Sequence, residues 1–350
     1  MVHGWPSLWS SWSNQITEFE KDHRVIALDQ RGFGSSTHPG NVHTSASMGD
    51  LVDDLVCVLQ DAGVETAMCM GHDWGSQVCY EAARQRPDIF TSVVGLAIPY
   101  IPYPGPFVPN THLLALSPKL AYQIFFDEHT ARATQELDYD KRRTLRGTLR
   151  DIGSPPPWEF LTSRETFMGG WEGVDEIPPI PFFSEEEEAY FIEQYETQGF
   201  GNTLYFYTHG PKHESWKHAQ AQGNFTIPCR ALSILPLQDP VGDWVHAAKV
   251  LQSAKFVPRL TTEVSILGSL QFSILRKFSS SFQCLVVLLK SPSFPRFVVL
   301  PKLLSFSALV PMLSTRSPYG SPYASRLFLL YFPPILSMLY EVTKLTTHPP

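Results

Sequence analysis

The feature that most constrains this chain is a five-residue turn, Gly71-His72-Asp73-Trp74-Gly75. The apolar run at residues 66–70 predicts a buried strand before the turn, and residues 76–86 predict a helix that ends before Pro87. A side chain in such a strand-to-helix turn is exposed at the carboxyl edge of a sheet, and its close neighbours must be small. Gly71 and Gly75 meet that requirement, so Asp73 is the predicted nucleophile.

Strand and helix patterns alternate on both sides of this turn. The predicted strands are residues 24–29, 66–70, 92–98, 228–237 and 260–266, and the predicted helices are 48–62, 76–86 and 242–254. Strands that alternate with helices form a parallel sheet covered by helices on both faces. The predicted fold class is therefore α/β.

A long insertion interrupts the alternation. Residues 99–109 hold five prolines, which marks an exit from the sheet, and residues 110–225 are rich in aromatic and acidic residues with little strand pattern. We interpret residues 99–225 as a helical cap inserted into the sheet domain. The predicted core then consists of residues 1–98 and 226–263.

The charge distribution changes abruptly near residue 264. Residues 1–263 carry 19 Lys and Arg against 33 Asp and Glu, whereas residues 264–350 carry eight basic residues and one acid, Glu341. The later part shows neither amphipathic period nor repeat, so we predict a low-complexity tail without a native-like fold. Only Met1-Val2 precede the loop at residues 3–6, where an interior strand is expected. The sheet is thus predicted to be incomplete at both ends.

Composition also bounds the partners. A net charge of −7 argues against a nucleic-acid partner, and the longest uncharged runs, 303–315 and 327–340, are too short to span a membrane. The five cysteines show no paired or metal-type spacing, which predicts thiols in a reducing compartment and a cytoplasmic location. No metal or cofactor is expected, and the oligomeric state is open. The sequence positions of these cysteines are 57, 69, 79, 229 and 284.

An aspartate at the nucleophile position selects a particular chemistry. A carboxylate can attack a saturated carbon that bears a leaving group and form an ester with the enzyme. Water must then attack the carbonyl carbon of Asp73 itself, so the negative charge develops on an oxygen of that side chain. The backbone N–H of Trp74 is one predicted donor to this oxygen. The second is Trp5, in the loop His3-Gly4-Trp5-Pro6.

Three motifs in order carry a family resemblance. The loop at residues 3–6, the segment Asp29-Gln-Arg-Gly-Phe-Gly-Ser-Ser36 and the turn at Asp73 together resemble the epoxide hydrolase branch of the α/β-hydrolases, over residues 3–263. The resemblance implies a small-molecule epoxide or related apolar substrate, and two cap tyrosines that donate hydrogen bonds to the ring oxygen. The segment at residues 121–126 indicates Tyr122. The segment at 199–207 indicates Tyr207 rather than Tyr205, since the family tyrosine follows the leucine by three residues.

Hydrolysis of the ester requires a base and an acid that orients it. Asp239 follows a predicted strand at the position of the acid, and Asp243 is a weaker choice inside the next helix. The family histidine is expected about 25–30 residues after the acid, but residues 264–269 read Val-Ser-Ile-Leu-Gly-Ser. Only His246 and His348 follow Asp239, and neither is selected as the base. The second step is therefore expected to be impaired.

Two other functions compete with this interpretation. A haloalkane or haloacid dehalogenase shares an Asp-Trp turn, and Trp74 could donate to a halide, but a halide leaving group does not need the two tyrosines. A catalytically dead fragment, or a pseudoenzyme that keeps its cap for binding, agrees with the missing histidine and strand. A serine-type esterase is least favoured because Asp73 occupies the serine position.

Overall fold

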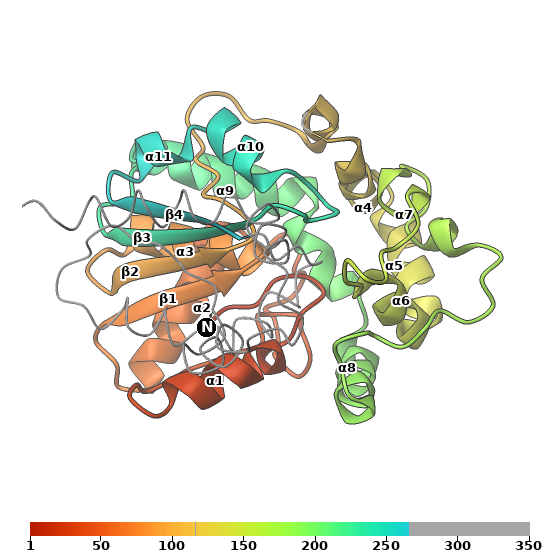
Figure 1. Ribbon diagram of the computed structural model, residues 1–350. Coiled ribbons are helices and arrows are strands. Elements are labelled where there is room, and N and C mark those ends of the chain that lie inside the picture. Colours follow the sequence, from red (N-terminus) through yellow and green to blue (C-terminus); the bar gives the residue numbers. More distant parts are fainter. Residues whose placement is uncertain (116, 266–350) are drawn as a thin grey trace, which may run out of the picture. The chain divides into compact units, whose positions relative to one another are not determined.

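A computed structural model describes residues 1–115 and 117–265. Within these residues four strands form one parallel sheet in the order β1 (Ala67–His72), β2 (Phe90–Leu96), β3 (Arg230–Pro236) and β4 (Leu260–Ser265) (Figure 1). The predicted parallel α/β sheet is confirmed. Val264 and Ser265, the first residues of the predicted tail (264–350) and of the expected histidine window (264–269), belong to β4, and the rest of both ranges lies outside the described residues.

Alternate strand residues point to opposite faces of the sheet. Both faces therefore carry apolar side chains, and helices cover them. Cys69, Val93 and Ala231 belong to the larger core cluster, to which α2 (Met48–Asp61), α3 (Trp74–Gln85), α10 (Trp244–Val250) and α11 (Ser253–Phe256) contribute. Met70, Val94 and Leu232 belong to a second cluster with Phe19 of α1 (Ser13–Phe19). The core therefore lies on both faces of the strands that position the turn.

Helix α2 shows how the sequence sets these elements. The side chain of Ser47 accepts a hydrogen bond from the backbone N–H of Asp50, and Asp50 in turn binds the Ser47 backbone, so the helix begins with a capping box. Its apolar residues recur at helical spacing and are buried against α3; they are Leu51, Val52, Leu55, Val56 and Leu59. The helix predicted at 48–62 is thus confirmed within one residue.

Residues between β2 and β3 are mostly helical. The helices α4 (Tyr122–Glu128), α5 (Thr130–Tyr139), α6 (Lys141–Thr148), α7 (Glu159–Thr162) and α8 (Glu185–Gln198) gather to one side of the sheet (Figure 1). Helix α9 (His209–Gln222) returns to the sheet, where Ser215 accepts a hydrogen bond from the backbone N–H of Met48 at 2.9 Å. The short 3₁₀ helices are Trp9–Trp12, Asn110–Ala115, Pro118–Leu120, Met168–Trp171 and Gly201–Phe206. The proposed domain boundaries stay predictions.

Two predicted elements differ from the structure. Residues 24–29 do not form a regular strand; only Leu28 makes a bridge, to Val2. A regular strand needs backbone partners along its length, and among the described residues only Val2 pairs with this segment as a strand does. The predicted helix at 242–254 is divided into α10 and α11 because Gln252 adopts a left-handed conformation, with φ of 52°.

The pairing of the cysteines also differs in part from the prediction. Cys69 of β1 and Cys79 of α3 form a disulfide, so the prediction of unpaired thiols is wrong for this pair. The tight strand–turn–helix connection brings their Cα atoms to 5.3 Å, a proximity that a spacing of ten residues does not reveal. Cys57 is exposed and Cys229 is buried, both as thiols, and Cys284 lies outside the described residues.

Across residues 1–115 and 117–265, none of the helices combines the length and the apolar character that a membrane crossing requires.

The packing of the turn generates a stability prediction. A Cβ atom on Gly71 would lie 2.0 Å from the carbonyl oxygen of Gly75, in rigid backbone. We expect Gly71→Ala to lower the free energy of unfolding by about 3 kcal/mol or more, measured by urea denaturation. Gly153→Ala is the control, because its Cβ would meet only Asp151 Oδ1 at 3.4 Å, and it should change stability by less than about 0.5 kcal/mol. Equal stability of the two variants would contradict this packing.

Candidate active site

The turn after β1 holds Asp73 in a rare backbone conformation. Its φ and ψ are 55° and −128°, in a region that non-glycine residues seldom adopt. The residue lies between the last residue of β1 and the first of α3, as the motif predicts. On the far side of the turn, a Cβ on Gly75 would lie 2.2 Å from the carbonyl oxygen of Val2. Both glycines are therefore required by close backbone contacts.

Two backbone amides converge on the carboxyl of Asp73. The Trp5 N–H donates to Asp73 Oδ1 at 2.9 Å, and the Trp74 N–H also donates to this carboxylate. Gly4 allows the approach, since a Cβ at that position would lie 2.3 Å from the same oxygen. The loop that carries Trp5 includes a cis peptide bond before Pro6. The predicted pair of donors, Trp5 and Trp74, is thus brought to one carboxyl group.

His3 holds this loop to the second motif. Its Nε2 accepts a hydrogen bond from the Gln30 N–H at 3.1 Å, so its Nδ1 carries the proton and donates to the Gly4 carbonyl at 2.8 Å. The Gln30 side chain donates to the His3 carbonyl at 2.6 Å. Burial lowers the pKa of His3 to about 4, which keeps the ring neutral. His3 therefore positions the loop through hydrogen bonds.

Tyr122 and Tyr207 come together from distant parts of the chain. Tyr122 begins α4, and Tyr207 follows the 3₁₀ helix Gly201–Phe206. Their ring centroids lie 5.7 Å apart and their hydroxyl groups are hydrogen bonded. The Tyr207 ring lies 5.6 Å from the Trp5 ring and 5.7 Å from the Trp74 ring. Tyr205 instead packs on Phe33 at 6.1 Å.

The site raises the pKa values of both its acids and its phenols. Burial raises the pKa of Asp73 to about 7; the Trp5 and Trp74 amides oppose that rise, and the charge of Asp239 adds to it. Burial is also the main reason that the pKa of Tyr122 lies above its usual value, with a smaller contribution from the charge of Asp73. The hydroxyl groups therefore stay protonated over the range in which Asp73 ionises.

Asp239 lies after β3, as predicted. Its Oδ1 accepts a hydrogen bond from the Val241 N–H at 2.8 Å, and burial raises its pKa to about 6. Its Oδ2 is buried and makes no hydrogen bond of good geometry within the described part of the chain, although the nearby Trp244 indole favours the charged form. Asp243 caps α10 by accepting from the His246 N–H, and both residues are exposed. His348 lies outside the described residues.

Sequence reasoning missed a network that joins the two tyrosine segments. The Asn110 side-chain amide donates to the Tyr207 carbonyl at 2.6 Å and to Asp127 Oδ2 at 2.9 Å. Asp127 also accepts from the His209 N–H at 2.6 Å. Lys212 donates to Asn110 Oδ1, and burial lowers its pKa to about 8. These contacts cross long stretches of sequence, so no local pattern indicates them.

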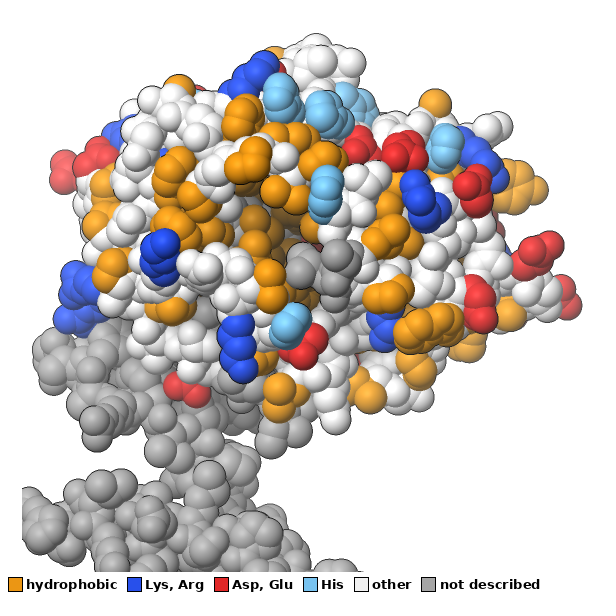
Figure 2. Space-filling view, turned by 90° about the horizontal axis from the view of Figure 1, so that it is seen from above, with side chains coloured by type: hydrophobic (Ala, Val, Ile, Leu, Met, Phe, Trp, Pro, Cys, Tyr) orange, Lys and Arg blue, Asp and Glu red, His pale blue; other side chains and the backbone are white. Residues whose placement is uncertain are grey.

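An apolar cavity of about 260 Å³ opens beside Trp74. Its walls come from the proline-rich segment after β2, from α9 and from α10, and Figure 2 shows hydrophobic side chains around a hollow on this face. Its lining includes Trp74, Ile98, Phe107, Leu113, Lys212 and Trp244. The cavity therefore suits an apolar small molecule near the turn.

Metal ligation finds no support in the same region. In the part of the chain that the structure describes, no three His, Cys, Asp or Glu side chains come together as a group that could hold a metal ion. The rings of His209 and His213 stack on one another at 5.3 Å, and Phe107 packs against both.

The similarity to known proteins agrees with this geometry. Residues 1–152 match the family model of the alpha/beta hydrolase fold. The chain is 30% identical to epoxide hydrolase A of Mycobacterium tuberculosis over 249 residues, which cover 69% of this chain and 75% of that protein. The chain belongs to the epoxide hydrolase family of the α/β-hydrolases. The family predicted from the three motifs is therefore confirmed.

Other members of the epoxide hydrolase family differ in length. The chain is 30% identical to the rat bifunctional epoxide hydrolase 2 over 222 residues, which cover 62% of this chain but 39% of that protein. It likewise spans 45% of the pig bifunctional epoxide hydrolase 2. This chain thus spans less than half the length of the bifunctional relatives.

Solved structures support the same fold. An epoxide hydrolase from an endophytic Streptomyces matches with a TM-score of 0.67 at 24% identity, over 83% of this chain and 89% of that one. Epoxide hydrolase A from Mycobacterium thermoresistibile matches with a TM-score of 0.65 at 23% identity, over 84% and 91%.

Proposed function

We propose that this chain opens small-molecule epoxides by attack of the Asp73 carboxylate. The observation that carries the proposal is the convergence of the Trp5 and Trp74 amides on a carboxyl group beside a hydrogen-bonded tyrosine pair. A carboxylate oxygen forms a bond to one ring carbon while the bond from that carbon to the ring oxygen breaks. The ring oxygen keeps the electron pair and takes a proton from Tyr122 or Tyr207.

The tyrosine pair fits the role of proton donor. An alkoxide is a poor leaving group, so a proton must reach the ring oxygen as the bond breaks. Tyr122 and Tyr207 are both buried, and burial raises the pKa of each phenol, so both carry the proton when Asp73 is ionised. The tyrosinate that remains after transfer is stabilised by the hydroxyl of its partner.

In the second step, hydrolysis of the ester, the Trp5 and Trp74 amides stabilise an oxyanion. Water gives a proton to a base and adds to the ester carbonyl of Asp73, and the carbonyl oxygen, now negatively charged, accepts hydrogen bonds from the Trp5 and Trp74 amides. The intermediate then collapses as the bond from the carbonyl carbon to the alkyl oxygen breaks, and that oxygen takes a proton to release the diol. Asp239 is the acid that would orient a base for this water. The sequence holds no histidine in the window at 264–269, so we expect slow ester hydrolysis and slow release of the diol.

The surroundings of Trp74 favour an epoxide over a haloalkane. The indole N–H of Trp74 interacts with the Tyr207 hydroxyl. This N–H is the donor that a halide leaving group would need, so it is already engaged. The apolar cavity beside Trp74 favours a small apolar substrate. The cytoplasmic location stays a prediction.

Incubation with an aryl epoxide such as styrene oxide tests the first step. We expect a stable mass increase of one substrate molecule on the peptide that contains Asp73, detected by mass spectrometry after proteolysis. Asp73→Asn is the matched control and should remain unmodified. A protein that melts cooperatively by circular dichroism yet forms no adduct would overturn the proposal and favour a catalytically dead protein.

The rate of adduct formation should depend on pH through the nucleophile. Because burial raises the pKa of Asp73 to about 7, the reactive carboxylate is a minor species below that pH. We expect the rate to rise about tenfold per pH unit below 7 and to level off above it, measured by quenched mass spectrometry. Asp73 titrates over a range of roughly pH 5 to pH 8. A rate that stays constant across this range would contradict the role of Asp73.

Substitution of the tyrosines tests the proton donors. Tyr122→Phe and Tyr207→Phe should each slow adduct formation by about a hundredfold, since each removes a donor to the ring oxygen. Tyr205→Phe removes a buried hydroxyl only two residues from Tyr207 and should leave the rate within about twofold, because Tyr205 packs on Phe33 instead. Similar losses in all three variants would assign the effect to packing.

A further inference from the structure

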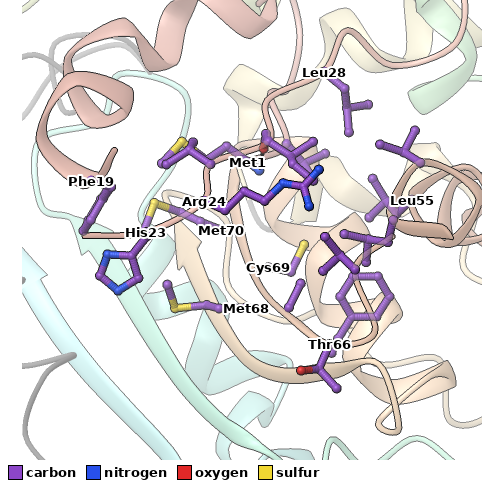
Figure 3. Close-up of a pocket in the computed structure, with 18 of the residues that line it drawn as sticks. Met1, Phe19, His23, Arg24, Leu28, Leu55, Thr66, Met68, Cys69 and Met70 are labelled. Atoms are coloured by element: carbon purple, nitrogen blue, oxygen red, sulfur yellow. Dashed lines mark hydrogen bonds between the residues drawn. The ribbon is translucent and has the colours of Figure 1, made fainter. Parts of the chain in front are cut away.

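Two cavities in the described part of the chain lie close to β1, and they differ in their distance from the reacting groups. A cavity of about 490 Å³ lies along β1, where residues 68–70 line it (Figure 3), and its lining does not include Asp73. The cavity beside Trp74 includes Gln123, whose side-chain amide donates to the Tyr122 hydroxyl at 3.5 Å. We call this second space the Trp74 cavity. The body of a substrate that reaches the tyrosines would lie in it.

The Trp74 cavity is apolar but contains a basic side chain. Its walls include Phe107 and Leu113. In the lining that the described residues form, Lys212 of α9 is the one lysine or arginine, whereas Asp243 and His246 of the same lining are exposed. A positive charge in apolar surroundings is costly unless an opposite charge lies beside it. A filled cavity should therefore supply Lys212 with such a partner.

The amino group of Lys212 keeps donors for a ligand. It donates a hydrogen bond to Asn110 Oδ1 and lies over the Trp74 ring, 5.3 Å from the ring centre. An ammonium group has three N–H donors, so the bond to Asn110 leaves donors for a further acceptor. Asp127 attracts the ammonium through space, but its two carboxylate oxygens accept from the Asn110 side chain and the His209 N–H.

The charge of Lys212 is compensated only in part. Burial lowers the pKa of Lys212 to about 8, and the attraction of Asp127 opposes this fall without cancelling it. A carboxylate that reached the ammonium from the cavity would supply a second opposite charge. One ammonium neutralises one charge, so a monoanion fits better than a dianion, which would carry an unpaired charge into the apolar lining.

We propose that Lys212 is a specificity-determining residue that binds a carboxylate of the substrate. The inference rests on the proposed epoxide opening at Asp73 and names the class of epoxide, an apolar body with one carboxylate a few bonds from the ring. Trp74 sets this spacing, because its ring centre lies 5.3 Å from Lys212 Nζ and 5.7 Å from the Tyr207 ring. A short chain across the indole would join the epoxide at the tyrosines to the carboxylate at Lys212.

This role affects binding rather than the chemical step. The carboxylate of the substrate keeps its charge while the epoxide ring opens, so Lys212 holds it equally before and during the reaction. An interaction of this kind lowers the substrate concentration needed for half-saturation and leaves the limiting rate unchanged. Lys212 is thereby distinguished from Tyr122 and Tyr207, which act on the ring oxygen.

Two unreactive ligands of equal shape test the charge preference on the full chain. Phenylbutyrate carries a carboxylate, and phenylbutyramide replaces it with a neutral amide. We expect the carboxylate to bind about tenfold more tightly by isothermal titration calorimetry, because a hydrogen bond between charged groups is stronger than one to a neutral acceptor. Equal affinities, or no binding of either ligand, would overturn the proposal.

Variants on α9 assign the preference to one side chain. Lys212→Met and Lys212→Gln should reduce the ratio of the two affinities to within about twofold, whereas Lys212→Arg keeps the charge and should keep most of the ratio. Lys217→Met makes the same change in net charge at an exposed ion pair with Glu214 and should leave the ratio as it is. The ratio is taken within each variant, so a general loss of affinity through Asn110 cancels. A ratio that survives in both neutral Lys212 variants would overturn the role of Lys212.

A pair of epoxides connects the site to the reaction. Epoxyhexanoate with its ring at the end remote from the carboxylate is compared with the corresponding amide, and the adduct on Asp73 is followed by quenched mass spectrometry. We expect half-saturation at an about tenfold lower concentration of the carboxylate, with limiting rates within about twofold, and no such difference in Lys212→Gln. Equal half-saturation by both epoxides would overturn the role of Lys212. Absence of any adduct alongside tighter binding of phenylbutyrate would instead overturn the proposed reaction and leave the carboxylate site in place.

Discussion

The contact between the Asp73 turn and the first residues of the chain is the constraint on which the site depends. Gly75 packs against the Val2 and His3 carbonyls, and Gly4 packs against the Asp73 carboxyl, at distances that admit no Cβ atom. These contacts bring one amide donor from the loop to a carboxyl whose other donor belongs to the turn itself. The strained backbone of Asp73 is maintained because both sides of the turn are filled by backbone.

These close contacts bury the site, and the burial explains the pKa values of its side chains. A carboxyl buried this deeply favours the neutral acid, and the two amides recover part of the lost solvation without neutralising the charge. Asp73 therefore ionises near neutral pH and keeps the reactivity of a weakly solvated anion. Burial favours the protonated form of the tyrosines as well, and the nearby carboxylate adds to that effect. In one buried environment Asp73 thus ionises near neutral pH while both tyrosines keep their protons.

Much of this arrangement could be predicted from local patterns. The glycines around Asp73, the capped helix after Ser47 and the spacing of the motifs are local features, and each predicts its element directly. The Asn110 link to Tyr207 could not be predicted, because it depends on two backbones that meet only after the cap folds. The Cys69–Cys79 disulfide and the irregular residues 24–29 also depend on tertiary neighbours.

The irregular segment at residues 24–29 lies beside the residues that lead into the loop of Trp5. An apolar run forms a strand only when its backbone groups find partners, and among the described residues Leu28 alone of this segment pairs, with Val2. Val2 also pairs with Gly71 on its other edge, so it links this segment to β1. The placement of the Trp5 amide therefore depends on the backbone contacts that Val2 makes with β1 and that Val2 and His3 make with Gly75.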